Sequence, residues 1–241
     1  MTANAWLLVA LPLAGAAILL LGGKRTNSWG HYFATAMSLG SFAVGALTFL
    51  EMLGQPAEER TTVLHLWDWI AVGNFQVPIA FQIDQLSIAF VLLITGVGSL
   101  IHVYSIGYME HDPRRRRFFA YLNLFVAFML LLVLAENLLL LYLGWEGVGL
   151  CSYLLIGFWF ERERAANAAK KAFVTTRIGD TFLMLGVALV AIRFGTLDLA
   201  AILEGAGTLS AGAATAIALL LFGRSEEHTS ELQSRETISY A

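Results

Sequence analysis

Long apolar segments, separated by short polar ones, run along almost the whole chain. A bilayer core about 30 Å thick needs about 20 helical residues at about 1.5 Å each. By this measure the sequence predicts six membrane-spanning helices, over residues 3–21, 31–53, 81–108, 118–135, 138–160 and 168–192. A seventh apolar segment, 209–222, reaches only about 21 Å and predicts a truncated span. The predicted fold class is therefore all-α, a polytopic transmembrane helix bundle.

The segments between the helices predict two smaller elements. In the second loop, residues 61–66 and 75–79 are β-prone and flank Gly73 and Asn74, which favours a small hairpin outside the membrane. Residues 198–204 have the pattern of a short amphipathic helix on the same side. Neither element carries recognisable chemistry.

Composition places the chain in a membrane. Hydrophobic residues make up 58% of the 241 residues, charged residues only 14%, and the mean hydropathy is +0.69. Apolar segments of bilayer-spanning length dominate such a chain, so we expect an integral membrane protein and not a soluble domain. The one cysteine, Cys151, lies in an apolar segment, so neither an internal disulfide nor a cysteine metal cluster can form.

Basic residues are distributed unequally between the loops. The second, fourth and sixth loops carry two of them, Arg60 and Arg193, whereas the odd-numbered loops carry ten: Lys24, Arg25, Arg114, Arg115, Arg116, Arg117, Arg162, Arg164, Lys170 and Lys171. Cytoplasmic loops are enriched in Lys and Arg, so the odd-numbered loops are predicted to be cytoplasmic and the N-terminus outside. Binding of nucleic acid or anionic lipid by residues 114–117 is the less favoured alternative, because topology alone demands a basic turn there.

Glu146 lies near the middle of the apolar segment 138–160. A carboxyl group at the centre of a membrane helix costs roughly 2.5–3.5 kcal/mol, so it predicts a functional site that holds and releases a proton. One helix face carries Tyr142, Glu146, Gly149 and Tyr153. Glycines around the acid permit either close helix approach or room for water. The alternative is that Glu146 stays protonated and only hydrogen-bonds a neighbouring helix.

The next predicted helix carries Lys170, Arg177 and Asp180 on one face, at spacings i, i+7 and i+10. Arg177 and Asp180 are also i, i+3 neighbours and can form an ion pair, which lowers the cost of placing both at depth. Such a pair serves helix packing as readily as charge transfer, and both roles stay open. Glu146, Arg177 and Asp180 form the predicted proton-transfer site. The secondary candidates are Lys170, Tyr142, Tyr153 and His102.

No cofactor or metal site is predicted on this chain. Four histidines lie in separate segments without the spacing of metal ligands, namely His31, His65, His102 and His111. We expect His102 to hydrogen-bond locally, and Asp84, with Ser87 three residues on, to cap a helix. Two Gly-Val-Gly segments lack the third glycine and the strand-turn-helix context of a dinucleotide site. Electron transfer is therefore expected on another chain.

Three segments resemble a known family. They are residues 143–158, LGWEGVGLCSYLLIGF, residues 101–109, IHVYSIGYM, and Arg177-Ile-Gly-Asp180. They resemble the antiporter-like membrane subunits typified by subunit L of bacterial NADH:quinone oxidoreductase (complex I). Mitochondrial subunit 5 and the large subunits of multisubunit sodium/proton antiporters are its counterparts. The resemblance covers about residues 1–222, and the first segment is long and specific.

This resemblance implies a bacterial inner-membrane subunit that moves protons through buried charged residues. It places NADH, flavin, iron–sulfur clusters and quinone on partner chains. The partners it implies are the other membrane subunits of complex I and the lipid bilayer, and it implies no binding of nucleic acid. Glu146 matches the family's central glutamate on the fifth helix, which a lysine on the seventh controls, and Arg177 and Asp180 match a charged pair on the sixth. Two alternatives stay open, a sodium/proton antiporter subunit without redox partners and an inert membrane anchor.

The C-terminal segment departs from the family pattern. Family members continue past the seventh helix with the controlling lysine, a broken helix and a second antiporter-like repeat. Residues 224–241, RSEEHTSELQSRETISYA, are instead polar and resemble a translated sequencing adapter. The predicted organisation is the N-terminal part of an antiporter-like domain at 1–223 and a non-native polar tail at 224–241. The chain is thus expected to be a fragment that is inactive alone.

Overall fold

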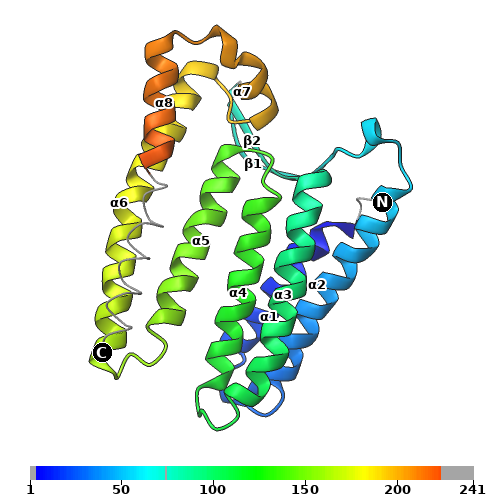
Figure 1. Ribbon diagram of the computed structural model, residues 1–241, viewed down its shortest axis with the longest axis vertical. Coiled ribbons are helices and arrows are strands. Elements are labelled where there is room, and N and C mark those ends of the chain that lie inside the picture. The colour runs from blue at the N-terminus through cyan, green and yellow to red at the C-terminus, as the bar shows by residue number, and fades with distance from the viewer. Residues whose placement is uncertain (1–3, 74, 224–241) are drawn as a thin grey trace.

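The computed structural model describes residues 4–73 and 75–223, and the polar tail predicted at 224–241 lies outside them (Figure 1). The helices are α1 (Trp6–Leu21), α2 (Gly30–Leu53), α3 (Gln85–Tyr108), α4 (Arg115–Val133), α5 (Leu138–Ile156), α6 (Glu163–Phe194), α7 (Leu199–Gly205) and α8 (Ala211–Gly223). Short 3-10 turns occupy Gly23–Thr26, Ala57–Glu59 and Ala206–Thr208. The predicted all-α membrane fold is confirmed, and α7 is the short helix expected in the sixth loop.

Among the described residues, five helices, α2 to α6, are long and apolar enough to cross a membrane, whereas the sequence predicts six full spans. The difference is α1, which has 16 residues and measures about 24 Å at about 1.5 Å per residue. Gly22 and Gly23 follow its last residue, and Gly23 adopts a φ of 54°, which a residue with a side chain rarely does. Residue 3, where the first predicted span begins, lies outside the described part.

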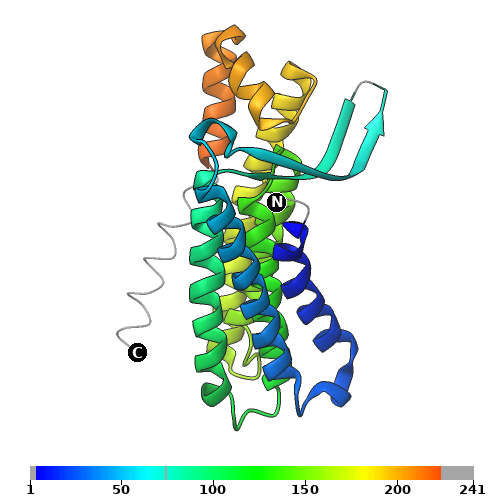
Figure 2. The same ribbon diagram turned by 90° about the vertical axis from the view of Figure 1, so that its right-hand side faces the viewer.

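The hairpin predicted in the second loop is present and longer than expected. β1 (Thr62–Val72) pairs antiparallel with β2 (Phe75–Ile83), and Figure 2 shows the hairpin reaching sideways beyond the helices. β2 includes residues 81–83, which the sequence analysis places in the third span. A short apolar run cannot be assigned to strand or helix from its pattern alone. Here tertiary pairing decides, because Gln82 N donates to the carbonyl oxygen of Leu134 at 2.8 Å.

α3 begins with the cap predicted for it. Asp84 accepts a hydrogen bond from Ser87 N at 2.7 Å, and Ser87 Oγ accepts one from Asp84 N at 2.8 Å, which closes a capping box. Burial opposes the charged form of Asp84. The hydrogen bonds from Ser87 and Gln82 outweigh burial and hold the pKa of this carboxyl below its ordinary value. The predicted capping role of Asp84 is confirmed.

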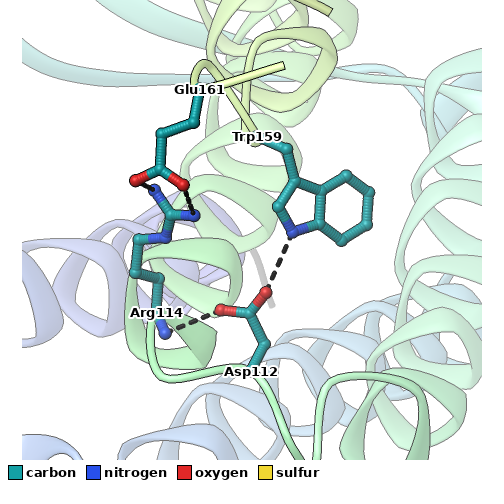
Figure 3. A network of polar contacts seen from close by, with 4 residues as sticks. All are labelled: Asp112, Arg114, Trp159 and Glu161. Atoms are coloured by element: carbon teal, nitrogen blue, oxygen red, sulfur yellow. Dashed lines mark hydrogen bonds and ion pairs between the residues drawn. The ribbon is translucent and has the colours of Figure 1, made fainter.

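Helices α1 to α4 form a four-helix bundle, and the later helices extend it to one side. α1 packs on α2 and α4, α2 on α3, α5 on α4, α6 on α5 and α8 on α6 (Figure 1). The basic turns meet at one end of this array, which we call the basic end, and the hairpin and α7 lie at the other. At the basic end Asp112 accepts a hydrogen bond from Trp159 Nε1 at 2.9 Å (Figure 3). Arg114 pairs with Glu161 at 3.2 Å, so the α3–α4 and α5–α6 turns are fixed together.

Two glycines let α5 approach α4 closely. A Cβ at Gly144 would come within 2.7 Å of the backbone of Leu132, and a Cβ at Gly147 would overlap the ring of Phe128. The sequence leaves two roles open for the glycines of this helix, and these two serve close approach. A Cβ at Gly149, in contrast, would meet nothing within 4 Å.

Gly144→Ala is expected to lower the free energy of unfolding by about 1–3 kcal/mol, because overpacking forces α4 and α5 apart. Gly149→Ala in the same helix is the matched control. It should leave the Tm unchanged or raise it, since alanine favours a helix over glycine by about 1 kcal/mol. Thermal unfolding of both variants in detergent measures the difference, and equal Tm values would contradict the close packing.

The turn between α4 and α5 joins three segments at the hairpin end. Asn137 Nδ2 donates to the carbonyl oxygen of Pro78 in β2 at 2.8 Å. From the other side, Leu199 N donates to the carbonyl oxygen of Glu136 at 3.2 Å. Burial, followed by the neighbouring carboxyl of Asp198, raises the pKa of the half-buried Glu136 side chain above its ordinary value. An acid outside the membrane spans therefore links the packing of this turn to pH.

The raised pKa of Glu136 predicts a loss of stability with rising pH. The folded state holds this proton more tightly than the unfolded state. Its contribution to stability is therefore complete below the ordinary pKa of 4.5 and is lost as the pH rises through the higher folded pKa. Glu136→Gln should remove this loss, so the Tm of the variant minus that of the native chain should increase with pH above 4.5. Thermal unfolding across a pH series measures this difference, and a difference independent of pH would contradict it.

Candidate functional site

Three charged side chains meet where α5 faces α6. Glu146, halfway along α5, contacts Nη1 of Arg177 through its Oε2. The same Nη1 lies 3.5 Å from Oδ2 of Asp180, which follows one turn later on α6. One guanidinium is thus held between two carboxylates from two helices. The structure brings together the three predicted proton-transfer residues, and we call them the ion cluster.

Burial of the ion cluster is uneven. The side chain of Asp180 is 6% exposed and that of Glu146 17%, whereas Arg177 is 39% exposed. Within the described part of the chain, Oε1 of Glu146 is buried and has no hydrogen-bond partner. Two carboxylates and one guanidinium leave one uncompensated negative charge, which a low-dielectric environment disfavours. The ion cluster can therefore take up one proton and keep an ion pair.

Phe173 extends the site along α6. The guanidinium carbon of Arg177 lies 4.6 Å from the centre of the Phe173 ring, a cation–π contact. The ring of Tyr153 on α5 lies 5.0 Å from the Phe173 ring, so this secondary candidate is linked to the ion cluster through Phe173. The sequence analysis does not single out Phe173, although its i, i+4 spacing to Arg177 is the signal that could have found it.

Lys170, another secondary candidate, is exposed and lies nearer the basic end of α6. It lines a cavity of about 290 Å³ between the ends of α4, α5 and α6, together with Tyr153, Arg114, Arg117 and Tyr121. The cavity lies on the basic-end side of the ion cluster, because Tyr153 follows Glu146 by two turns in that direction. It provides space for water between the basic end and the Tyr153–Phe173 contact.

The remaining two secondary candidates have other surroundings. Tyr142, one turn before Glu146 on α5, packs against an apolar core that includes Leu183 and Val187 of α6. His102 lies in α3, inside the bundle of α1 to α4, and its Nδ1 is 2.7 Å from the carbonyl oxygen of Gly98. The local hydrogen bond predicted for His102 is confirmed.

The chemistry that the site offers is proton exchange and ion pairing. Across residues 4–73 and 75–223, no three side chains of His, Cys, Asp or Glu lie close enough together to hold a metal ion. The ion cluster itself has one cation that stays charged, Arg177, and two acids that can each carry a proton. Movement of charge along α5 and α6 is the process that these groups can support.

Two family models match the chain. Residues 69–119 match the N-terminus of NADH-ubiquinone oxidoreductase (complex I) chain 5, and residues 135–225 match the transmembrane model of NADH:quinone oxidoreductase and the Mrp antiporter. NADH-quinone oxidoreductase subunit L of Mycobacterium tuberculosis is 58% identical over 216 residues, which are 90% of this chain. Subunit L of Escherichia coli is 42% identical over 200 residues, 82% of this chain.

A solved structure has the same fold. A chain of the Mrp complex from a Dietzia species matches with a TM-score of 0.75 and 24% identity, over 93% of this chain and 23% of that one. The present chain spans about a third of the length of the curated relatives, 34% for Mycobacterium tuberculosis and 32% for Escherichia coli. The second family model includes both helices that hold the ion cluster. The chain belongs to the antiporter-like membrane subunits that NADH:quinone oxidoreductases and Mrp antiporters share.

Proposed function

We propose that this chain is part of a proton-translocating membrane subunit of an NADH:quinone oxidoreductase, in which Glu146 holds the proton in transit. The observation that carries the proposal is the ion cluster, in which two acids share one guanidinium within the apolar helices α5 and α6. Ionisable groups inside a membrane are costly and mark ion and proton pathways. The identity to subunit L of Mycobacterium tuberculosis supports the same function.

Arg177 is the switch in this proposal. While its guanidinium contacts Glu146, the carboxylate stays ionised. In the structure the guanidinium lies 3.5 Å from Asp180. When it turns fully toward Asp180, Glu146 loses its partner and takes up a proton. At an effective dielectric constant near 20, moving a unit charge from about 4 Å to about 8 Å changes the interaction by about 2 kcal/mol. That is about a thirty-fold change in proton occupancy, enough to load and release one proton.

Further membrane segments complete the site. A guanidinium that is 39% exposed would be costly against lipid, so we infer that another part of the subunit or a neighbouring membrane subunit covers this face of Arg177. The redox chemistry, with NADH, flavin, iron–sulfur clusters and quinone, belongs to partner subunits. The excess of Lys and Arg at the basic end supports a topology with that end in the cytoplasm of a bacterial cell and the chain in the inner membrane.

A second candidate function is sodium/proton exchange in a multisubunit antiporter without redox partners. The match of residues 135–225 to a model shared with the Mrp antiporter favours it. The two candidates differ in what drives proton movement. In membranes that contain the full-length subunit with its partners, NADH-driven acidification in sodium-free buffer supports the oxidoreductase. Proton movement that needs a sodium gradient supports the antiporter.

Glu146→Gln in the full-length subunit, within its complex, is expected to lower NADH-driven proton pumping by about ten-fold or more, because an amide cannot carry the proton. Glu51→Gln, at an exposed helix end, is the matched control and should leave pumping unchanged. A pH-sensitive dye in membrane vesicles measures the rate. An unchanged rate for Glu146→Gln would instead support the reading of the chain as an inert membrane anchor.

The 241-residue chain by itself is expected not to translocate protons. Arg177 keeps its charge at any accessible pH. Within the described helices, no second basic side chain is seen to contact Glu146 and so to replace Arg177 as its partner. Reconstitution into vesicles with an imposed membrane potential and an internal pH-sensitive dye tests this. Proton uptake should equal that of empty vesicles, and clear driven uptake would refute the proposed dependence on further segments.

A further inference from the structure

A second set of polar side chains lies inside the bundle of α1 to α4, and the proposed function does not use it. His102 of α3, Asn123 of α4 and His31 of α2 are 1%, 0% and 4% exposed, and we call them the histidine cluster. Four of their atoms are buried without a hydrogen-bond partner among the described residues, namely His31 Nδ1, His102 Nε2, Asn123 Nδ2 and Asn123 Oδ1.

The three side chains gather around the ring of Phe119 on α4. That ring lies 6.0 Å from each of the two imidazole rings. The amide of Asn123 lies beside the His102 ring, although neither side chain reaches good hydrogen-bonding geometry with the other. Asn123 also packs against α1 at Gly15, where a Cβ would overlap the amide nitrogen. Polar atoms from three helices therefore converge on one region that the fourth helix closes.

The hydrogen bond of His102 to its own helix defines what its second nitrogen needs. Nδ1 lies 2.7 Å from the carbonyl oxygen of Gly98, which can only accept, so Nδ1 carries a hydrogen. In the neutral ring Nε2 then offers a lone pair and needs a donor. Three residues before His102, Ser99 Oγ lies 3.1 Å from Ser38 Oγ of α2. Two hydroxyls that share one hydrogen bond leave one hydrogen for a further acceptor.

Water is the ligand that fits this set of atoms. Buried polar atoms in proteins are nearly always hydrogen-bonded, either to protein or to ordered water. Inside a bilayer the demand is stronger, because lipid tails supply no donor or acceptor. A buried water typically makes about three hydrogen bonds to groups that lack other partners, whereas empty cavities are apolar. Imidazole nitrogens and a primary amide supply both the donor and the acceptor that such a water requires.

We propose that the histidine cluster binds ordered water inside the bundle of α1 to α4, and that His102 exchanges its proton with the basic end of the protein through this water. The proposed site is separate from the ion cluster, because its residues come from α2, α3 and α4 and none from α5 or α6. Its existence depends only on unsatisfied polar atoms within the bundle. The proposal therefore stands or fails independently of proton pumping by Glu146.

His31 connects the histidine cluster to the basic end. It lies in the first turn of α2, and Arg115 at the start of α4 is close enough to act on it electrostatically. α1 carries no titratable side chain. On the other three helices, the titratable or charged side chains toward this end, besides the histidine cluster, are Tyr32, Tyr104, Tyr108, Arg115, Arg116, Arg117 and Tyr121. None of these groups is a carboxylic acid, and in this proposal the bound water carries the proton between His102 and the basic end.

Radiolytic hydroxyl-radical labelling with mass spectrometry detects side chains next to bound water, and we would apply it to the 241-residue chain in lipid nanodiscs. After correction for intrinsic reactivity, Phe119 is expected to be labelled about five-fold or more faster than Leu130 and Leu134, which are equally buried. In D2O, the C2 hydrogen of His102 should exchange within about ten-fold of the rate of the exposed His111. Equal labelling of Phe119 and the leucines, or no exchange at His102, overturns the proposal.

Two variants test which atoms hold the water. Asn123→Leu should reduce the labelling of Phe119 to the level of the leucines. Thr95→Val is the matched control, because the buried Thr95 hydroxyl already donates to the Val91 carbonyl at 2.6 Å, and labelling should stay unchanged. Ser99→Ala is a milder substitution that serves if Asn123→Leu does not fold, and it should lower the labelling in the same direction. Unchanged labelling of Phe119 in Asn123→Leu, or in Ser99→Ala if Asn123→Leu does not fold, overturns the proposal that these side chains hold the water.

Discussion

The ion pair between Glu146 and Arg177 sets the main demand on this fold. Opposite charges in a low-dielectric medium stabilise each other only while the surrounding structure keeps them in contact, because separation leaves two desolvated charges. The two residues lie on different helices, so α5 and α6 must be held in one position. Close approach at Gly144 and Gly147 fixes the middle of α5 against α4. Asn137 fixes its start to β2.

Several parts of this arrangement follow from sequence alone. The spacing of Arg177 and Asp180 within a continuous helix determines that both lie on one face, whatever packs against them. The insertion cost of a carboxyl group predicts a functional role for Glu146 without knowledge of its partner. The capping role of Asp84 is local as well, since both bonds of the capping box join residues three apart. Each of these predictions depends on distances of one or two helical turns.

Contacts between helices could not be predicted in the same way. The residue spacing pairs Arg177 with Asp180, and the resemblance assigns Glu146 to a lysine on another helix, yet the structure places Arg177 against Glu146. The face of α5 that meets α6 is determined by close packing at its glycines and by the turns at both of its ends. The periodicity of the sequence does not specify this face. The same limit hid Asn123, a single polar residue whose burial beside His102 requires three helices to meet. Residues 81–83 form strand and not helix for this reason too, because pairing with the α4–α5 turn decides their conformation.

The two polar sites satisfy the same constraint by different chemistry. In the ion cluster, opposite charges offset each other, and a bound proton neutralises the one negative charge that remains. In the histidine cluster the groups can all be neutral, so no ion is needed and water can satisfy them. In the proposed function, a proton bound to the first site, the ion cluster, changes the contacts of Arg177 and so the position of α5 relative to α6. A proton passing through the second leaves four tightly packed helices where they are, because water can reorient in place. The first site is therefore suited to coupling proton transfer to movement, and the second to exchange without it.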